Sequence, residues 1–190
     1  MSVELVFFRA HIIMYAKHTV KTLKLGKFMK NNIQIRCVGR MQENWQKEAI
    51  HMFTTRCQPF CDFNILEVSE GHQKSAKPNI PKTISNEADS LLNNIPDNTF
   101  IIALDQNGKK LTSESFADLL SGNHPKFNFQ RSKFIFIIGG SWGLDKTVIN
   151  KADFILSLSD MTLPHSLARI FLVEQIYRAL SIINNKNYHK

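Results

Sequence analysis

The chain has 190 residues and a formal charge of +8, with 43% hydrophobic and 21% charged residues. This length favours a single folded domain, and the ordinary composition excludes wholesale disorder. No uninterrupted apolar run reaches about 18 residues, so we expect no membrane-spanning helix. Three cysteines cannot all pair within one chain, which argues against a disulfide-built secreted domain and favours a reducing, cytoplasmic compartment.

Residues 1–32 form a basic segment ahead of the patterned part of the chain. Six Lys or Arg residues against the single acid Glu4 give this segment a charge of +5, which leaves +3 for residues 33–190. Its apolar stretch is broken by Arg9, so the signal-peptide pattern is incomplete. We expect a basic N-terminal extension that is a disordered or surface segment, or one not translated because the protein starts at Met29. Residues 33–190 are expected to form the folded domain.

From residue 33 onward, the spacing of apolar residues switches between two periods. Alternating or continuous apolar runs predict strands, and apolar residues three and four apart predict helices. In chain order, the prediction is a strand at 33–38, a helix at 43–57, a strand at 60–68, a loop at 69–82, a helix at 83–95, a strand at 99–104, a helix at 112–120, a strand at 133–138, a short helix after Gly143, a strand at 154–158 and a long helix after Pro164.

The repeated order of strand and helix predicts an α/β fold, a single domain with a mostly parallel sheet and helices on both faces. The strands at 99–104 and 133–138 are the most continuously apolar, as expected for strands buried on both faces. We therefore predict that these two strands lie centrally in the sheet.

Three segments at the carboxyl ends of predicted strands carry unusual residues. They are 104–108, the glycine-rich 139–143 and 157–165. Because ligands of parallel sheets bind at this edge, we expect a crevice there. The glycines could let backbone amides approach a ligand, or could serve only a tight turn. The patterns G-x-G-x-x-G and G-x-x-x-x-G-K-[ST] are absent, which argues against an ordinary dinucleotide enzyme or an ATPase.

No metal site is expected from the sequence. His51, Cys57 and Cys61 are close along the chain, but their spacing is not that of a zinc site. Buried thiols without a chemical role explain the two cysteines more simply, because free cysteine is among the most buried residue types.

An apolar stripe follows the final predicted helix, and its spacing predicts a buried core or a dimer interface rather than a cofactor site. The charged residues beside it, Arg169, Glu174 and Arg178, are expected to form a solvated or ion-paired face, although an arginine near the crevice could also meet phosphate. The stripe consists of Leu167, Ile170, Phe171, Ile176, Tyr177 and Leu180.

Four motifs in the second half of the chain are specific as a set. They are FIIGGSWGL at 136–144, LSDMTLPH at 158–165, EQIYRA at 174–179 and NYHK at 187–190. Their order, their spacing and the termination at Tyr-His-Lys resemble the RlmH family, the bacterial ribosomal RNA large subunit methyltransferases of the SPOUT superfamily. The similarity runs from about residue 32 to residue 190.

The resemblance implies a small α/β domain with a C-terminal trefoil knot, assembled as a homodimer, that holds S-adenosyl-L-methionine in the knot loops. The implied reaction is methylation of N3 of a pseudouridine in 23S ribosomal RNA, on the assembled 70S ribosome. By position, the implied cofactor-binding residues are Leu104, Gly139, Gly140, Leu158, Ser159, Asp160, Met161, Thr162 and Leu163.

The resemblance also implies that the C-terminal tail, Tyr188, His189 and Lys190, contacts the RNA. His189 is a catalytic candidate because the pKa of histidine lies near neutrality and the N3 proton must leave. Arg169 is a second candidate, which could orient a phosphate or the imide oxygen. Two positions depart from the family: Lys190 replaces the more frequent arginine and loses its bidentate fork, and Asn187 stands where proline is common.

Two other functions stay open at this point. One is a non-catalytic RNA- or ribosome-binding module with the same knotted fold. The other is a nucleotide-binding α/β protein of the flavodoxin type. Binding of S-adenosylmethionine separates the second of these from the methyltransferase, and methyl transfer to ribosomes separates the first.

Overall fold

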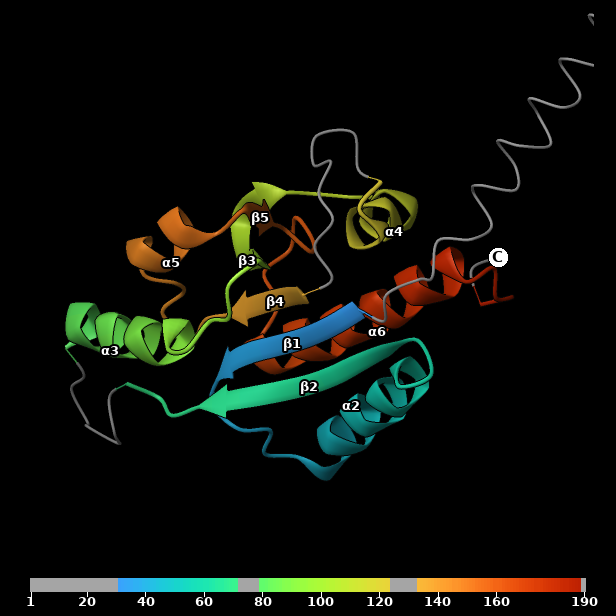
Figure 1. Ribbon diagram of the computed structural model, residues 1–190. Coiled ribbons are helices and arrows are strands. Elements are labelled where there is room, and N and C mark those ends of the chain that lie inside the picture. The colour runs from blue at the N-terminus through green and yellow to red at the C-terminus, as the bar shows by residue number, and fades with distance from the viewer. Residues whose placement is uncertain (1–30, 72–78, 124–132, 189–190) are drawn as a thin grey trace, which may run out of the picture.

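Strands and helices alternate along the computed structural model, which describes residues 31–71, 79–123 and 133–188 (Figure 1). The predicted extension therefore lies almost wholly outside the described residues. Within the described segments, no helix combines the length and apolarity needed to cross a bilayer. The elements are β1 (Asn31–Val38), α2 (Asn44–Cys57), β2 (Cys61–Val68), α3 (Ile80–Leu92), β3 (Thr99–Lys109), α4 (Ser113–Ser121), β4 (Lys133–Ile138), α5 (Lys146–Lys151), β5 (Phe154–Leu156) and α6 (His165–Ile183).

The strands form one sheet in the order β2-β1-β4-β3-β5, and every neighbouring pair is parallel. The predicted α/β class with a parallel sheet is confirmed. Strand β4 lies at the centre and β3 beside it, as their continuous apolar sequences predicted. Strand β1 is also interior, although its alternating sequence is more typical of a half-buried strand.

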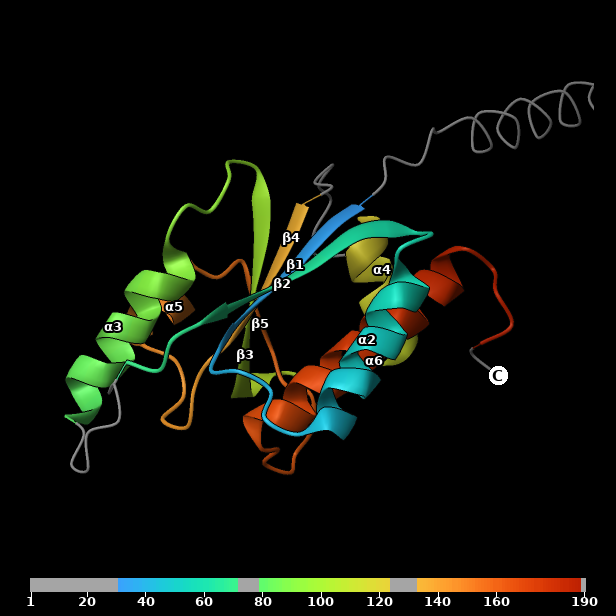
Figure 2. The ribbon, with the colours of Figure 1, turned by 90° about the horizontal axis from the view of Figure 1, so that it is seen from below.

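Helices cover both faces of the sheet, with α2, α4 and α6 on one side and α3 and α5 on the other (Figure 2). The central strand supplies both cores, because successive side chains of a strand point to opposite faces. Phe134 and Phe136 join the core under α4 and α6, whereas Ile135 and Ile137 join the core under α3 and α5. The ring of Phe136 packs edge-on against Phe116 of α4, with 5.9 Å between the ring centroids.

Helix α3 is displaced by three residues from its predicted range of 83–95. It begins earlier because the Asn79 side chain caps it, accepting a hydrogen bond from the Lys82 backbone N–H at 3.2 Å. Pro81, which suggested a loop, sits in the first turn, where a missing N–H costs nothing. The helix ends at Leu92, and Asn94 two residues later has a φ of 49° that a helix cannot continue through.

The ends of β3 and β5 also differ from the prediction. Strand β3 continues to Lys109, and both Leu104 and Lys109 pair with Leu156 across an irregularity in the ladder. Gly108 permits this, because a Cβ there would lie 2.7 Å from the backbone carbon of Leu156. Strand β5 ends at Leu156, two residues before the predicted end, and the chain then turns away from the sheet.

The chain after β5 returns across the sheet. Strand β5 is the edge strand beyond β3, whereas α6, which follows it, packs against α2 and reaches the carboxyl ends of β1 and β2 through Arg169. Residues 157–164 therefore pass over the carboxyl ends of β3 and β4. This path fits the trefoil knot that the resemblance implies.

Arg36 in the interior strand β1 is buried, with 4% of its surface exposed. Its guanidinium donates to the backbone oxygens of Leu91 at 2.9 Å, Asn93 at 2.5 Å and Asn94 at 3.2 Å. These carbonyls belong to the end of α3, where a helix leaves acceptors unsatisfied and favours a cation. Arg36 therefore ties α3 to the sheet.

We predict that Arg36→Met lowers the free energy of unfolding by about 2–4 kcal/mol, because it leaves buried carbonyl groups without a donor. Urea unfolding at constant m-value measures the change. Arg36→Lys, the matched variant, keeps the charge with fewer donors and should lose less. A loss below about 1 kcal/mol for Arg36→Met would show that the carbonyls find other donors.

Candidate functional site

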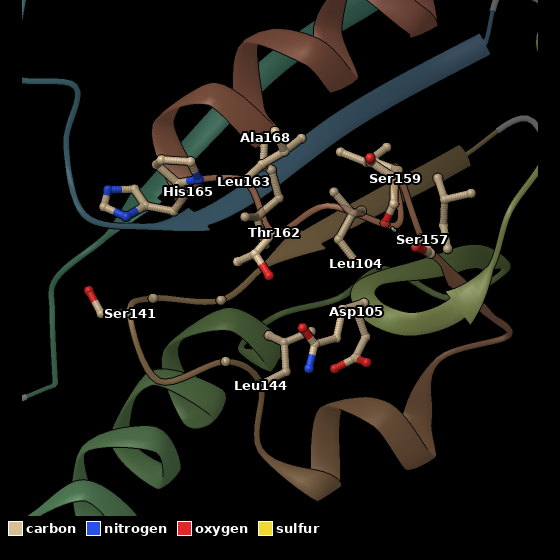
Figure 3. Close-up of a pocket in the computed structure, with 18 of the residues that line it drawn as sticks. Leu104, Asp105, Ser141, Leu144, Ser157, Ser159, Thr162, Leu163, His165 and Ala168 are labelled. Atoms are coloured by element: carbon tan, nitrogen blue, oxygen red, sulfur yellow. Dashed lines mark hydrogen bonds between the residues drawn. The ribbon is translucent and has the colours of Figure 1, made fainter.

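Three stretches of chain enclose a cavity of about 910 Å³ at the carboxyl edge of the sheet (Figure 3). They are the part of β3 beyond its pairing with β4 and the loops that follow β4 and β5, and they correspond to the three segments that the sequence placed at this edge. The lining residues are 104–106, 138–144, 156–159, 161–165 and Ala168. His165 and Ala168 belong to the first turn of α6, so this helix closes the cavity at one side.

The structure brings together nearly all residues that the resemblance assigns to a cofactor. Asp160 is the exception, because its side chain is 82% exposed and forms an ion pair with Lys110. The assigned residues that line the cavity are Leu104, Gly139, Gly140, Leu158, Ser159, Met161, Thr162 and Leu163.

The glycine loop after β4 is a tight hairpin. Gly140 and Gly143 form an antiparallel bridge, with the Gly143 N–H donating to the Gly140 oxygen at 3.2 Å. Gly143 has a φ of +80°, which favours glycine. A Cβ on Gly139 would lie 2.5 Å from the Gly143 oxygen. The turn therefore requires glycine for its own geometry, and the same residues also line the cavity.

The loop after β5 is held by its own serines. The Ser157 hydroxyl donates to the Ser159 backbone oxygen, and the Ser159 hydroxyl accepts from the Met161 N–H, both at 3.0 Å. Ser157 is buried, whereas Met161 is 76% exposed at the cavity rim. These local bonds fix the loop and leave other backbone groups free to face the cavity.

The cavity wall carries few charged side chains. Asp105 is the single carboxylate among the lining residues, and no Lys or Arg lines the cavity. A ligand with a phosphate would find no Lys or Arg here, only His165, hydroxyls and backbone N–H groups, and it would be repelled by Asp105. The wall suits an aromatic or apolar ligand that carries positive charge.

Glu87 on α3 lies directly behind the glycine loop, and the sequence pattern did not single it out. It is 3% exposed, and its Oε1 accepts the Gly71 N–H at 3.1 Å. Its Oε2 has no hydrogen-bond partner among the described residues and would lie 3.0 Å from a Cβ on Gly140. The sequence did contain a signal for this residue, because Glu87 is an acid next to Ala88, which was predicted to lie on the inward face of a helix.

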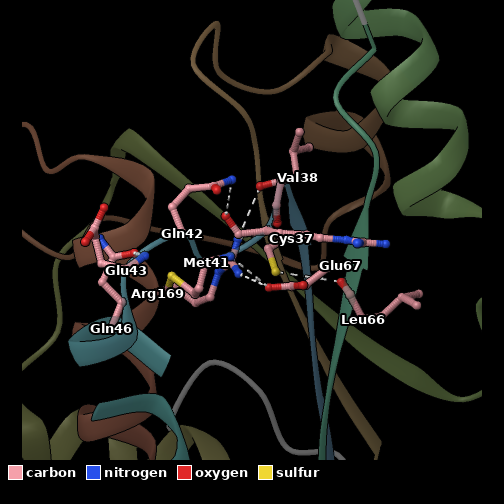
Figure 4. Close-up of polar contacts among 11 residues, drawn as sticks. Cys37, Val38, Met41, Gln42, Glu43, Gln46, Leu66, Glu67 and Arg169 are labelled. Atoms are coloured by element: carbon pink, nitrogen blue, oxygen red, sulfur yellow. Dashed lines mark hydrogen bonds and ion pairs between the residues drawn. The ribbon is translucent and has the colours of Figure 1, made fainter. Parts of the chain in front are cut away.

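Arg169, one of the two catalytic candidates, does not line this cavity. It is 1% exposed, and its Nη1 donates to Glu67 Oε1 at 2.6 Å (Figure 4). Its Nη2 donates to the backbone oxygens of Val38 at 3.2 Å and Gly39 at 3.0 Å. The side chain therefore joins the second turn of α6 to the carboxyl ends of β1 and β2.

Tyr188, the one tail residue that the structure describes, lies against the middle of α6 and does not line the cavity. Its hydroxyl donates to Glu174 at 3.1 Å, and burial and the Glu174 charge raise the pKa of Tyr188. Glu174 also pairs with Arg178 at 2.6 Å. His189 and Lys190 lie outside the described residues.

The apolar stripe on α6 divides into two parts. Ile176 and Leu180 are buried in the core, as one of its two interpretations predicted. Leu167 and Phe171, near the start of the helix, are 40% and 41% exposed. The first half of α6 therefore presents an apolar surface that the single chain does not cover.

All three cysteines are buried as free thiols. Burial is the main cause that raises the pKa of Cys37 to about 12, and the nearby Glu67 adds to it while Arg169 opposes it. The pKa of Cys57 is raised by its hydrogen bond with Cys61 and by burial. In the described part of the chain, no group of three His, Cys, Asp or Glu residues could hold a metal ion.

We predict that the folded protein reacts with none of its three thiols when treated with dithionitrobenzoate at pH 8, and with all three in denaturant. The reason is that a buried thiol with a raised pKa presents neither thiolate nor access. Absorbance of the released thiolate counts the reactive groups. A fast reaction of any thiol in the folded protein would contradict the burial described.

Three segments at the carboxyl edge of a parallel sheet enclose a ligand site without Lys or Arg, and one of them returns across the sheet. This arrangement defines a class of protein. The chain belongs to the SPOUT methyltransferase family: the family described as "Predicted SPOUT methyltransferase" matches residues 31–189. The family that the four motifs predicted is thereby confirmed.

Two similar relatives of this chain carry the same name. Ribosomal RNA large subunit methyltransferase H of Clostridium botulinum is 40% identical over 163 residues, covering 84% of this chain and 99% of the relative. The protein of that name from Carboxydothermus hydrogenoformans is 40% identical over 160 residues, covering 83% and 99%. Among solved structures, a probable methylase family protein from Haemophilus influenzae has a TM-score of 0.49 at 14% identity, covering 85% of this chain and 72% of that one.

Proposed function

We propose that this protein methylates N3 of a pseudouridine in 23S ribosomal RNA, using S-adenosyl-L-methionine as the methyl donor and the assembled 70S ribosome as the substrate. The observation that carries the proposal is the cavity: loops of a SPOUT methyltransferase enclose a space with one carboxylate and no cationic side chain. The names of the relatives support ribosomal RNA as the substrate.

The lining residues fit S-adenosylmethionine. Leu104, Leu158 and Leu163 offer apolar surface for an adenine ring and a thioether chain. Asp105 is the one charged group of matching sign for a ligand that carries a sulfonium and an ammonium. The family match argues against the flavodoxin-type alternative, because residues 31–189 match a SPOUT methyltransferase family.

The methyl-transfer step requires little chemistry from the side chains. Bound S-adenosylmethionine supplies an already electrophilic methyl group. The glycine loop 139–143 and the serine-held loop 157–163 keep the pocket rigid, and that rigidity aligns the reacting atoms and excludes water. The N3 proton must also be accepted, and we assign that role to His189 of the tail.

We further propose that the active unit is a homodimer. Tyr188 lies against the middle of α6 and does not line the cavity of its own chain, so we expect a tail that contacts the substrate to reach the cavity of a second protomer. Trp45 and Met52 on α2 and Leu167 and Phe171 on α6 are large apolar residues that are 40–53% exposed. These two helices pack side by side, and a second copy would cover their apolar surface.

Transfer of labelled methyl groups from S-adenosylmethionine to ribosomes tests the proposal. We expect label in 23S RNA of 70S ribosomes, with far less transfer to isolated 23S RNA. Binding of both S-adenosylmethionine and ribosomes without any transfer would replace the proposal with the non-catalytic ribosome-binding module. Absence of S-adenosylmethionine binding would reject the cofactor.

We predict that Gly139→Ala weakens S-adenosylmethionine binding at least about tenfold, or about 1.4 kcal/mol. The added Cβ would lie 2.5 Å from the Gly143 oxygen, so the glycine loop must open. Calorimetry measures the affinity. Gly122→Ala is the matched control, because Gly122 caps α4 with a φ of 77° away from the cavity, and it should cost stability alone. Unchanged affinity in Gly139→Ala would remove the loop from the cofactor site.

We predict that deleting residues 188–190 lowers methyl transfer at least about tenfold while S-adenosylmethionine affinity stays within about twofold. The tail supplies the proposed base, and Tyr188, its described residue, does not line the cavity, so methyl transfer falls and cofactor binding does not. Single-turnover transfer and calorimetry give the two numbers. Full turnover by the truncated protein would exclude the tail from the mechanism.

A further inference from the structure

A second cavity, of about 640 Å³, lies between helix α2 and the edge strand β2. It shares no lining residue with the cofactor cavity. We call it the basic groove, because its lining includes Arg40, Lys47 and Arg169. Neither the four sequence motifs nor the mechanism above uses it.

The cations of the basic groove are poorly neutralised. Arg40 and Lys47 are exposed, and within the described segments no ion pair joins either of them to an acid. Glu67 is the one carboxylate of the lining, and it already accepts from Arg169 at 2.6 Å and from the Met41 N–H at 3.3 Å. Arg169 and Glu67 neutralise each other, which leaves Arg40 and Lys47 as two exposed positive charges of the groove.

Arg169 at the base of the groove carries an unsatisfied donor. Among the described residues its Nε has no hydrogen-bond partner, and the side chain is 1% exposed. Buried donors in native proteins are nearly always paired, and leaving one unpaired is costly. Because Arg169 lines the groove, an anion bound there would bring negative charge close to this guanidinium.

The polar neighbours suit a sugar-phosphate chain. Asn64 and Gln58 line the groove and carry amide groups that can donate to phosphate or ribose oxygens. The Asn64 Oδ1 is already used, accepting from Gln34 at 2.7 Å, and this leaves its NH₂ group as the available part. Cations with such donors form the usual backbone contacts of RNA-binding proteins.

The groove is placed to act with the cofactor cavity. Arg169 directly follows Ala168, which lines that cavity, and Arg40 directly follows Gly39. A Cβ on Gly39 would lie 4.0 Å from Nε2 of His165, another lining residue of the cavity. The two sites therefore meet at the start of α6.

We propose that the basic groove binds the phosphate backbone of the substrate RNA next to the nucleotide that enters the cofactor cavity. This inference rests on the proposed function. It assigns the contacts with RNA phosphates to Arg40 and Lys47, while Arg169 forms the base of the groove. A second copy of this chain is the competing occupant, since the proposed dimer surface includes Trp45 and Met52 on the same helix α2.

Steady-state methyl transfer to 70S ribosomes at several salt concentrations tests the groove, with Arg40→Gln, Lys47→Gln and the double variant. We expect each single variant to raise the KM for ribosomes about three- to tenfold, with kcat and S-adenosylmethionine affinity unchanged. The slope of log KM against log salt should fall by about 0.7–1 for each cation removed. Lys151→Gln is the charge-matched control, since Lys151 is an exposed cation on α5, on the other face of the sheet.

A double variant with the KM and salt slope of the wild type would overturn the proposal that the groove binds RNA. An equal change in Lys151→Gln would also overturn it, because that result would indicate an effect of bulk charge alone. Dissociation of the oligomer by Lys47→Glu in sedimentation, without loss of ribosome affinity per protomer, would assign the groove to a protein contact instead. If wild-type protein binds ribosomes but transfers no methyl group, the proposed function fails, and the same variants in ribosome filter binding still decide the groove.

Discussion

The arrangement of both sites depends on how Arg169 holds helix α6. One guanidinium joins the helix to Glu67 at the end of β2 and to the oxygens of Val38 and Gly39 at the end of β1. The chain leaving β5 must therefore cross the carboxyl edge of the sheet to reach this anchor. That crossing forms the third wall of the cofactor cavity on one side of the helix and exposes the basic groove on the other. Removing one partner of such a buried pair typically costs about 3–5 kcal/mol.

Much of the fold was predictable because the apolar pattern reports burial. The continuous apolar run of β4 predicted a strand buried on both faces, and in the structure Phe134 and Phe136 join one core while Ile135 and Ile137 join the other. The boundaries that were wrong depend on single capping and pairing contacts. Arg36 illustrates the limit, because a cation in a strand predicts a solvated face, whereas here it satisfies the carbonyls at the end of α3.

The site was predictable in its location and less so in its details. Strand ends of a parallel sheet gather at one edge, so the segments around Leu104, Gly139 and Leu158 had to meet. Sequence spacing could not show that Arg169 pairs with Glu67, nor that Tyr188 folds back against Glu174 of α6. Both depend on how the final helix packs, which is a long-range property. The net charge was a poor guide, because +5 of the +8 belongs to residues 1–32 and no Lys or Arg lines the cavity.

The most direct measurement of the central claim is a crystal structure of the protein with S-adenosylhomocysteine, the product of methyl transfer. We expect an adenosyl group enclosed by the end of β3 and the loops after β4 and β5, with Asp105 as the nearest charged group of the wall. The contacts of Arg169 to Glu67, Val38 and Gly39 should be intact. Density for the ligand in the basic groove, or at a site away from the carboxyl edge of the sheet, would contradict it.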